Sequence, residues 1–78
     1  MFDQEKFSTR LRKLRRDANI SQQVLADVIG VSTNQVSQME KGLKTTSLTR
    51  LCLLCDYFHV SADYLLGQTD DGPHPSTP

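Results

Sequence analysis

Apolar residues recur along the chain at intervals of three and four, the spacing that gathers them on one face of a helix. Five successive segments show this spacing, and no segment reads as a strand. A residue with a short side-chain oxygen precedes each segment, as expected of a helix N-cap. The predicted N-caps are Asp3, Ser21, Ser32, Ser47 and Ser61. The pattern therefore predicts a compact, all-α domain of five helices.

The same spacing indicates which side chains form the core. We expect these to be Phe7, Leu11, Leu14, Ala18, Leu25, Ala26, Ile29, Val36, Met39, Leu48, Leu51, Leu54, Cys55 and Phe58. The predicted helices end at Asn19, at Gly30, at Gly42, after Phe58 and at Gly67, and the last of them runs from Ala62 to Leu66. From residue 68 the composition changes to Asp, Gly, Pro, Ser and Thr. We therefore expect a domain over residues 1–67 and a disordered tail or linker stub over residues 68–78.

The size and composition of the chain limit its function. Its 78 residues allow one domain, with little room for an enclosed cofactor site beside the core. The apolar runs are far shorter than a membrane span, no signal peptide is expected, and two cysteines are too few for a disulfide framework. No nucleophile–base arrangement, metal-ligand set or phosphate-binding glycine loop is evident. We expect a cytoplasmic, nucleoid-associated protein that is not an enzyme and uses no cofactor or small-molecule ligand.

Charge is divided unevenly along the chain. All nine basic residues lie at or before Arg50, beside five acidic ones, whereas the remainder holds four acidic residues and no Lys or Arg. The first part therefore carries a net charge of +4 and the second −4. This division favours an anionic partner for one side of the molecule, although chance splits of this size occur in small proteins.

The segment from Ser21 to Gly42 has the form of a helix-turn-helix. Two helices of about eight residues, each preceded by a serine, are joined by a short turn that contains Gly30. A small residue, Ala26, stands where the third predicted helix would cross the second closely. Gln35, three residues after Ser32, completes a capping box. Other pairs of antiparallel helices share parts of this pattern.

The outward face of the third predicted helix, about residues 33–41, is polar and uncharged. It carries Thr33, Asn34, Ser37 and Gln38, with no acidic residue before Glu40. Asn and Gln hydrogen-bond bidentately to adenine in the major groove, and Thr contacts a thymine methyl or a polar base edge. A merely solvated face more often carries Glu and Lys. The composition therefore favours base recognition over a solvated face.

Several groups of residues together resemble the helix-turn-helix domain of the phage repressor and Cro family, also called the xenobiotic-response-element (XRE) family. The resemblance runs from Phe7 to Gly67, about three-quarters of the chain. The groups are Ile20-Ser21-Gln22, Leu25-Ala26, Ile29-Gly30-Val31-Ser32, Val36-Ser37-Gln38-Met39-Glu40-Lys41-Gly42 and Val60-Ser61-Ala62-Asp63-Tyr64-Leu65-Leu66-Gly67.

The resemblance implies roles for individual residues. The base-reading positions of the family fall on Thr33, Asn34 and Gln38, with Ser37 beside them. DNA phosphates are expected at Gln22, Ser32, Lys41, Lys44, Thr45 and Thr46. Gln22 would stand at a helix N-terminus, whose free N–H groups favour phosphate. Arg15 and Glu40 match a structural ion pair between the first and third helices.

Three weaker signals have structural interpretations. The pair Cys52 and Cys55 lacks the further ligands that zinc needs, so two small core residues are favoured over a metal site. His59 is interpreted as a helix C-cap. The basic residues of the first helix are interpreted as a solvated face, with a wider DNA footprint as the alternative. These residues are Arg10, Arg12, Lys13 and Arg16.

Leu53 and Tyr57 are apolar at positions that are often polar or small in the family. Val24 and Val28 form a similar pair on the second helix. We predict that Leu53 and Tyr57 contribute to a homodimer contact, with packing under the fifth helix or the tail as the alternative.

The sequence as a whole predicts a transcriptional regulator from a bacterium or a phage, most simply a repressor. It would bind double-stranded DNA as a dimer, on a near-palindromic operator. The alternative is an antitoxin-like or co-regulator interaction module of the same fold, with DNA binding secondary or absent. The neutral net charge and the apolar pairs favour this alternative, whereas the polar third helix disfavours it.

Overall fold

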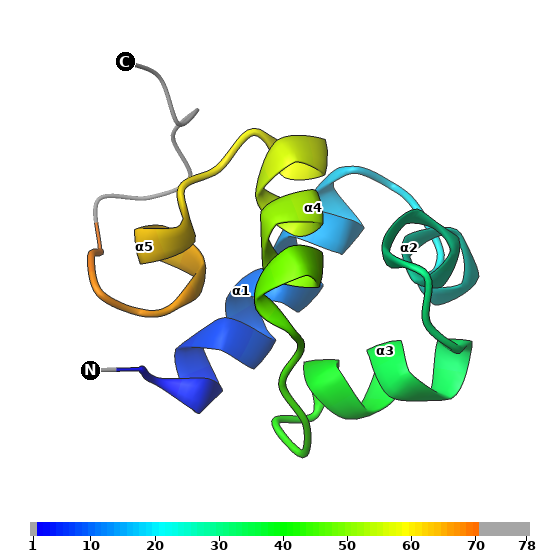
Figure 1. Cartoon of the computed structure of the whole chain (residues 1–78), viewed down its shortest axis with the longest axis horizontal. Coiled ribbons are helices and arrows are strands. Elements are labelled where there is room, and N and C mark those ends of the chain that lie inside the picture. Colours follow the sequence, from blue (N-terminus) through cyan, green and yellow to red (C-terminus); the bar gives the residue numbers. More distant parts are fainter. Residues whose placement is uncertain (1, 71–78) are drawn as a thin grey trace.

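The computed structural model describes residues 2–70, and in this range the chain forms five helices and no strand. The helices are α1 (Gln4–Asp17), α2 (Gln22–Ile29), α3 (Thr33–Glu40), α4 (Leu48–Phe58) and α5 (Ala62–Leu65). Figure 1 shows α4 crossing in front of α1, with α2 and α3 on one side of this pair and α5 on the other. The predicted all-α, five-helix fold is confirmed.

Side-chain caps explain where the helices begin. At each start, a side-chain oxygen accepts a hydrogen bond from the backbone N–H three residues later. The five capping residues are the predicted Asp3, Ser21, Ser32, Ser47 and Ser61. Each such cap stabilises a helix by about 1 kcal/mol relative to alanine. The predicted cap at the end of α4 is also present, since His59 is left-handed with φ 57°.

One apolar core joins all five helices. Its fully buried members come from every helix, and the largest are Phe7, Leu11, Leu25, Met39, Leu54 and Leu65. Burying each such side chain stabilises the fold by about 1.5–3 kcal/mol. The helix pairs that pack together include α1 with α3, α2 with α3 and α2 with α4. The two helices of the helix-turn-helix are thus held by the rest of the core.

Some core predictions were wrong. Leu48 is 80% exposed, because the first turn of α4 borders an open hollow instead of another helix. Ala18 and Cys52 are exposed, while Cys55 is half-buried against the core. Ala18 is the C-cap of α1 and lies past its last buried turn. Cys52 follows Leu51 on α4 and so points about 100° away from the core face.

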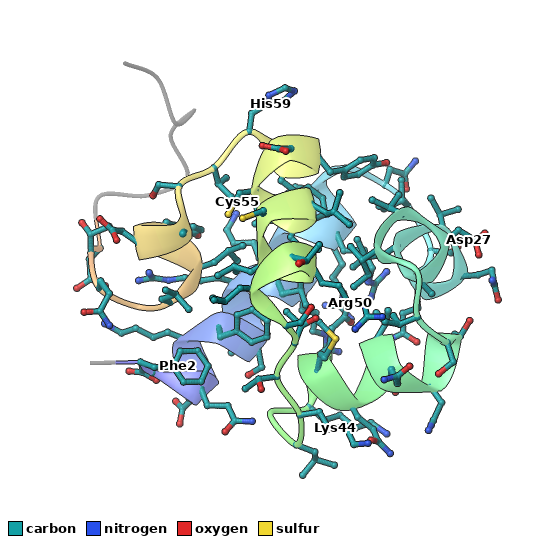
Figure 2. The ribbon with its side chains drawn as sticks, in the orientation of Figure 1. Phe2, Asp27, Lys44, Arg50, Cys55 and His59 are labelled. Carbon is teal, nitrogen blue, oxygen red and sulfur yellow. The ribbon has the colours of Figure 1, made fainter. Side chains whose placement is uncertain are left out.

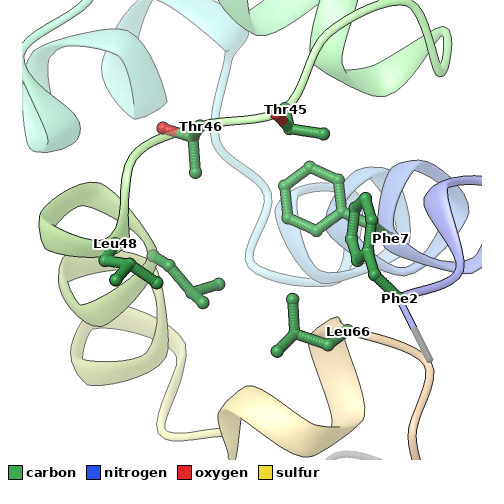
Figure 3. Close-up of a pocket in the computed structure, with 7 residues that line it drawn as sticks. Phe2, Phe7, Thr45, Thr46, Leu48 and Leu66 are labelled. Carbon is green, nitrogen blue, oxygen red and sulfur yellow. The ribbon is translucent and has the colours of Figure 1, made fainter.

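The hollow beside Leu48 has a volume of about 200 Å³ and is mainly apolar. Figure 3 shows its walls, which come from α1, α4, the end of α5 and the loop between α3 and α4. The lining residues are Phe2, Phe7, Thr45, Thr46, Leu48, Leu51 and Leu66. Two of the seven, Thr45 and Thr46, were predicted to contact phosphate.

The predicted fifth helix is one residue too long, since α5 ends at Leu65 and Leu66 is its C-cap. The chain then returns to the start of α1. The Asp3 N–H donates to the Leu66 carbonyl at 3.0 Å, and the Gln68 N–H donates to the Asp63 carbonyl at 2.8 Å. The division into a domain and a disordered tail stays a prediction, because residues 71–78 lie outside the described part of the chain.

Candidate nucleic-acid interface

The turn between α2 and α3 fixes the direction in which α3 leaves α2. Gly30 caps α2 in the left-handed conformation, with φ 74°. The N–H groups of Gly30 and Val31 both donate to the Ala26 carbonyl, at 2.8 and 3.0 Å. A Cβ at Gly30 would meet nothing within 4 Å, so backbone conformation alone favours glycine here. Ala26 itself is fully buried, on the helix that packs against α3.

The start of α3 is closed by the predicted capping box. The Ser32 hydroxyl accepts from the Gln35 N–H at 3.1 Å, and the Gln35 side chain accepts from the Ser32 N–H at 3.3 Å. These two side chains therefore hold the helix start. Ser32 remains exposed, at the end of α3 where N–H groups favour an anion.

The outward face of α3 is polar. Asn34 is exposed, and Ser37 and Gln38 are half-buried. Within residues 2–70 the side chains of these three residues make no hydrogen bond to the protein. Thr33 differs, since its hydroxyl donates to the Gln23 side chain of α2 at 2.6 Å. The face thus presents three uncommitted polar side chains and one that is held by α2.

The other end of α3 is anchored by a buried ion pair. Arg15 Nε and Nη2 donate to the two carboxylate oxygens of Glu40, at 2.6 and 3.0 Å. The side chains are only 14% and 4% exposed. The hydrogen bonds that Arg15 donates to Glu40 raise the pKa of its guanidinium, against the opposing effect of desolvation. Arg15 also donates to the Ile20 carbonyl at 2.9 Å, so α1, the start of α2 and α3 meet here.

Gln22 belongs to the same cluster. Its Nε2 donates to Glu40 at 3.1 Å from the first turn of α2. A side-chain amide has two N–H groups, and this bond uses one of them. The second remains for an outside acceptor such as phosphate.

The loop after α3 carries the remaining predicted phosphate contacts. Lys41 is the C-cap of α3, and the Leu43 N–H donates to the Gln38 carbonyl at 2.9 Å, which folds the loop back against the helix. Lys44 and Thr45 are exposed, whereas Thr46 is half-buried. Figure 2 shows Lys44 beside the end of α3. The structure therefore brings Lys41 and Lys44 to the edge of the α3 face.

The predicted dimer residues lie elsewhere. Leu53 and Tyr57 are on α4, and each is 40% exposed. The Tyr57 ring packs edge-on against Phe58, with centroids 5.0 Å apart. Val24 on α2 is 42% exposed, whereas Val28 packs against the core. Apolar surface is thus present on α2 and α4.

Sequence reasoning missed Arg50. Its Nε donates at 3.1 Å to the carbonyl of Ile29, the last residue of α2, which has no partner within the helix. Figure 2 shows Arg50 reaching from α4 toward α2 and the turn that follows it. The two residues are 21 positions apart, so no local pattern could have revealed the bond.

Two other kinds of site were sought in residues 2–70. No group of three or more His, Cys, Asp or Glu side chains there is arranged to hold a metal ion. None of the helices in that range has the length and apolar character needed to cross a membrane.

The chain belongs to the helix-turn-helix family, whose sequence model matches residues 11–65, and within it to the phage repressor and Cro type. Relatives from Bacillus subtilis (strain 168) are the uncharacterized HTH-type transcriptional regulator YobD and the HTH-type transcriptional regulator AnsR. YobD is 36% identical over 65 residues, covering 83% of this chain and 58% of YobD. AnsR is 37% identical over 59 residues, covering 76% and 51%. The chain thus spans little more than half the length of these relatives.

Solved structures of similar fold are also a phage repressor and a transcriptional regulator. The P22 c2 repressor protein, in complex with synthetic operator 9T, has a TM-score of 0.75 at 30% identity, covering 81% of this chain and 96% of the repressor. A transcriptional regulator from Listeria innocua has a TM-score of 0.80 at 26% identity, covering 90% and 65%.

Proposed function

We propose that this protein binds double-stranded DNA sequence-specifically and regulates transcription as a repressor, with α3 in the major groove. The observation that carries the proposal is the polar face of α3. Asn34, Ser37 and Gln38 make no hydrogen bond within the described chain, so their polar groups are available to base edges. The likeness to the P22 c2 repressor bound to its operator supports the same use of the fold.

Thr33 is the fourth base-reading residue of the proposal. Its hydroxyl is already a donor to Gln23, and it keeps lone pairs that can accept from a base amino group. Its methyl group can contact a thymine methyl. Thr33 therefore acts as a pre-positioned reader, held by α2 before DNA arrives.

Contacts to DNA phosphates hold the domain in register. Their donors are proposed to be Gln22, Ser32, Lys41, Lys44, Thr45 and Thr46, which lie around the start and end of α3 and at the start of α2. Such contacts position a protein on DNA without reading its sequence. The Arg15–Glu40 pair fixes the angle of α3, because it ties the last residue of that helix to α1.

The active form is proposed to be a homodimer at chromosomal DNA in the cytoplasm. Two copies would place their α3 helices in successive major grooves, about 34 Å apart, on a near-palindromic operator. Leu53 and Tyr57 supply exposed apolar surface for the contact between the copies.

Selection of random duplexes by the purified protein tests the DNA proposal. The native protein is expected to enrich a short palindromic motif. The Asn34→Ala/Gln38→Ala variant should lose preference at defined positions, since each bidentate contact contributes about 1–3 kcal/mol of discrimination. Thr49→Ala, an exposed polar change on α4, serves as control and should keep the motif. Failure of the native protein to enrich any motif at low salt would favour the interaction-module alternative.

Sedimentation equilibrium tests the dimer. Leu53→Lys and Tyr57→Lys should each raise the dimer dissociation constant. Leu48→Lys makes the same change on the same helix at a residue that is 80% exposed, and it should leave association unchanged. Equal association in all these proteins would remove Leu53 and Tyr57 from the interface.

A further inference from the structure

The two cysteines of α4 are arranged differently from the buried pair that the sequence predicted. Cys52 is exposed, Cys55 is half-buried against the core, and both are free thiols. They stand three residues apart in the middle of the helix, so their side chains are neighbours on one face. The pair therefore forms a dithiol that solvent reaches at Cys52.

The helix keeps the two thiols apart. Residues at this spacing have Cβ atoms about 5–6 Å apart, whereas a disulfide needs about 3.5–4.5 Å. Closing the bond would distort α4 between Leu51 and Leu54, which are both buried in the core. The fold therefore disfavours a disulfide between Cys52 and Cys55.

A metal ion held between the two sulfurs suits this spacing. Two metal–thiolate bonds of about 2.3 Å each, the length found with zinc, can separate the sulfurs by up to about 4.6 Å. A disulfide brings them to about 2.05 Å. Because the metal-bridged separation is the wider one, an ion can bind both thiols without deforming α4.

The charge around the pair favours a cation. No Lys or Arg follows Arg50 in the sequence, and Asp56 follows Cys55 directly on the helix. Burial, then Cys52 and Asp56, raise the pKa of the Cys55 thiol above its ordinary value. Cysteines that sense peroxide need the opposite setting, an electropositive one that lowers the thiol pKa. A bound cation would instead offset the repulsion between the two thiolates and Asp56.

The number of available donors identifies the ion. Within residues 2–70, no third His, Cys, Asp or Glu side chain completes a metal site with this pair. Figure 2 shows His59 at the end of α4, with its side chain pointing away from the helix. Structural zinc takes four protein ligands, and calcium and magnesium take oxygen ligands, so none of these ions suits two thiols. Soft thiolates select Cu(I), and this ion is satisfied by two sulfur ligands in line.

We infer that Cys52 and Cys55 together bind one Cu(I) ion per chain. Each thiol releases its proton to solvent when the ion binds, and the two Cu–S bonds form without any change in oxidation state. None of the residues placed in contact with DNA takes part, so the site does not depend on the proposed function. It adds a metal-binding site to the helix that carries Leu53 and Tyr57.

Transfer of Cu(I) from a chromogenic chelator to the reduced protein, without oxygen, tests the inference. The native protein is expected to take up one ion per chain and to show the ultraviolet absorption band of a copper–thiolate bond. Cys52→Ser and Cys55→Ser should each weaken the uptake by more than about 100-fold, the most that loss of a group outside the metal's ligands usually costs. Circular dichroism verifies that each variant keeps its helices. Uptake by either serine variant with the native affinity would overturn the inference.

Cys52→Ser/Thr49→Cys is the matched control. It keeps two thiols on α4, one of them at an exposed position, but Thr49 lies six residues before Cys55 and about 120° around the helix from it. This variant should bind Cu(I) no better than the single serine variants. Equal affinity in the native and control proteins would mean that the spacing is irrelevant, and the inference would be wrong.

Two other uses of the dithiol are distinguished by separate measurements. Oxidised glutathione should form the intrachain disulfide more readily in urea-unfolded protein than in folded protein, releasing two glutathione thiols for each bond. Equal ease in both states would show that α4 does not hold the sulfurs apart, and would contradict the inference. So would one Cu(I) ion per two chains in sedimentation equilibrium, which would show that Cys52 links two copies instead.

Discussion

Each end of α1 carries two basic residues at the same spacing, but one pair is bonded to an acidic residue and the other is not. Lys6 and Arg10 are four residues apart, as are Arg12 and Arg16, and the second pair lies about 120° around the helix from the first. Both side chains of the first pair bond to Asp70, at 2.9 and 2.6 Å. The second pair has no such partner within residues 2–70 and lines a polar hollow between α1, the start of α2 and the end of α3.

In the first pair, the Arg10 guanidinium makes several interactions within the fold. Arg10 donates to the carbonyls of Tyr64 and Thr69, at 2.6 and 2.7 Å, as well as to Asp70. Its guanidinium also lies 4.4 Å from the centre of the Tyr64 ring, within cation–π range. An acidic residue from the second part of the chain thus neutralises one end of α1 and leaves the other end positive. A net charge of zero is therefore compatible with a cluster of cations at one end of α1 that have no acidic partner within residues 2–70.

The largest effect is expected from Glu40→Ala, which would give the second end of α1 a further unpaired cation. Arg15, whose side chain is only 14% exposed, would lose its only acidic partner within residues 2–70, so the free energy of unfolding should fall by about 3 kcal/mol. Urea unfolding measures the loss. Asp17→Ala, which breaks the exposed pair with Lys13, is the control and should have a much smaller effect. Equal losses would show that the Arg15–Glu40 pair does not anchor α3.

Gly67→Ala tests how closely the first end of α1 is packed. Gly67 has φ 77°, and a Cβ there would lie 2.7 Å from Asp3 Cβ and 3.2 Å from Lys6 Cβ. Strain and overlap together should cost about 2–4 kcal/mol in thermal unfolding. Gly30→Ala has a similar φ and no neighbour within 4 Å, so only strain of about 1–2 kcal/mol is expected. Equal costs would mean that the backbone near Asp3 shifts to accommodate the added methyl group.

Arg10→Met and Arg12→Met compare one member of each pair directly. Arg10→Met removes three hydrogen bonds, and the free energy of unfolding should fall by about 1–2 kcal/mol. Arg12→Met breaks no bond in the described chain and should leave stability within about 0.5 kcal/mol of the native value. Equal free energies of unfolding for the two variants would contradict the difference between the two ends of α1.

Asp70 provides the smallest and most specific test, through pH. Hydrogen bonds from Lys6 and then Arg10 lower the pKa of the Asp70 carboxyl below its ordinary value of about 4. The folded state therefore favours the charged form, and this contribution to stability is complete above that ordinary value. It is lost as the pH falls through the lowered pKa. The difference in stability between the native protein and Asp70→Asn should therefore vanish as the pH falls through this interval. An NMR titration of the Asp70 carboxyl with an ordinary or raised midpoint would contradict the lowered pKa.

Features that depend on a few neighbouring residues were predictable from the sequence. The capping residues, the left-handed Asn19 and His59, and the capping box at Ser32 involve bonds that span three to five positions. The 3.6-residue period likewise predicted that Asn34 and Gln38 would lie on the outer face of α3 while Val36 was buried.

Features that depend on how helices meet were not predictable. Arg10 has partners 54 to 60 positions away, and Thr33 bonds to a residue ten positions back on another helix. The exposure of Leu48 follows from a hollow that only the assembled helices define. For the same reason the sequence could not distinguish Arg10 from Arg12, although both lie on one helix and carry one charge.

The hydrogen bond between the Asp3 N–H and the Leu66 carbonyl brings the beginning and the end of the five-helix unit together. The segment before α1 and the segment after α5 both lie beside α5 at this junction, on the other side of the molecule from α2 (Figure 1). A polypeptide joined before residue 3 or after residue 70 would start from one place, remote from the α2–α3 turn. A sensor or an oligomerisation module could therefore be fused at either end of the five-helix unit without covering the α2–α3 turn.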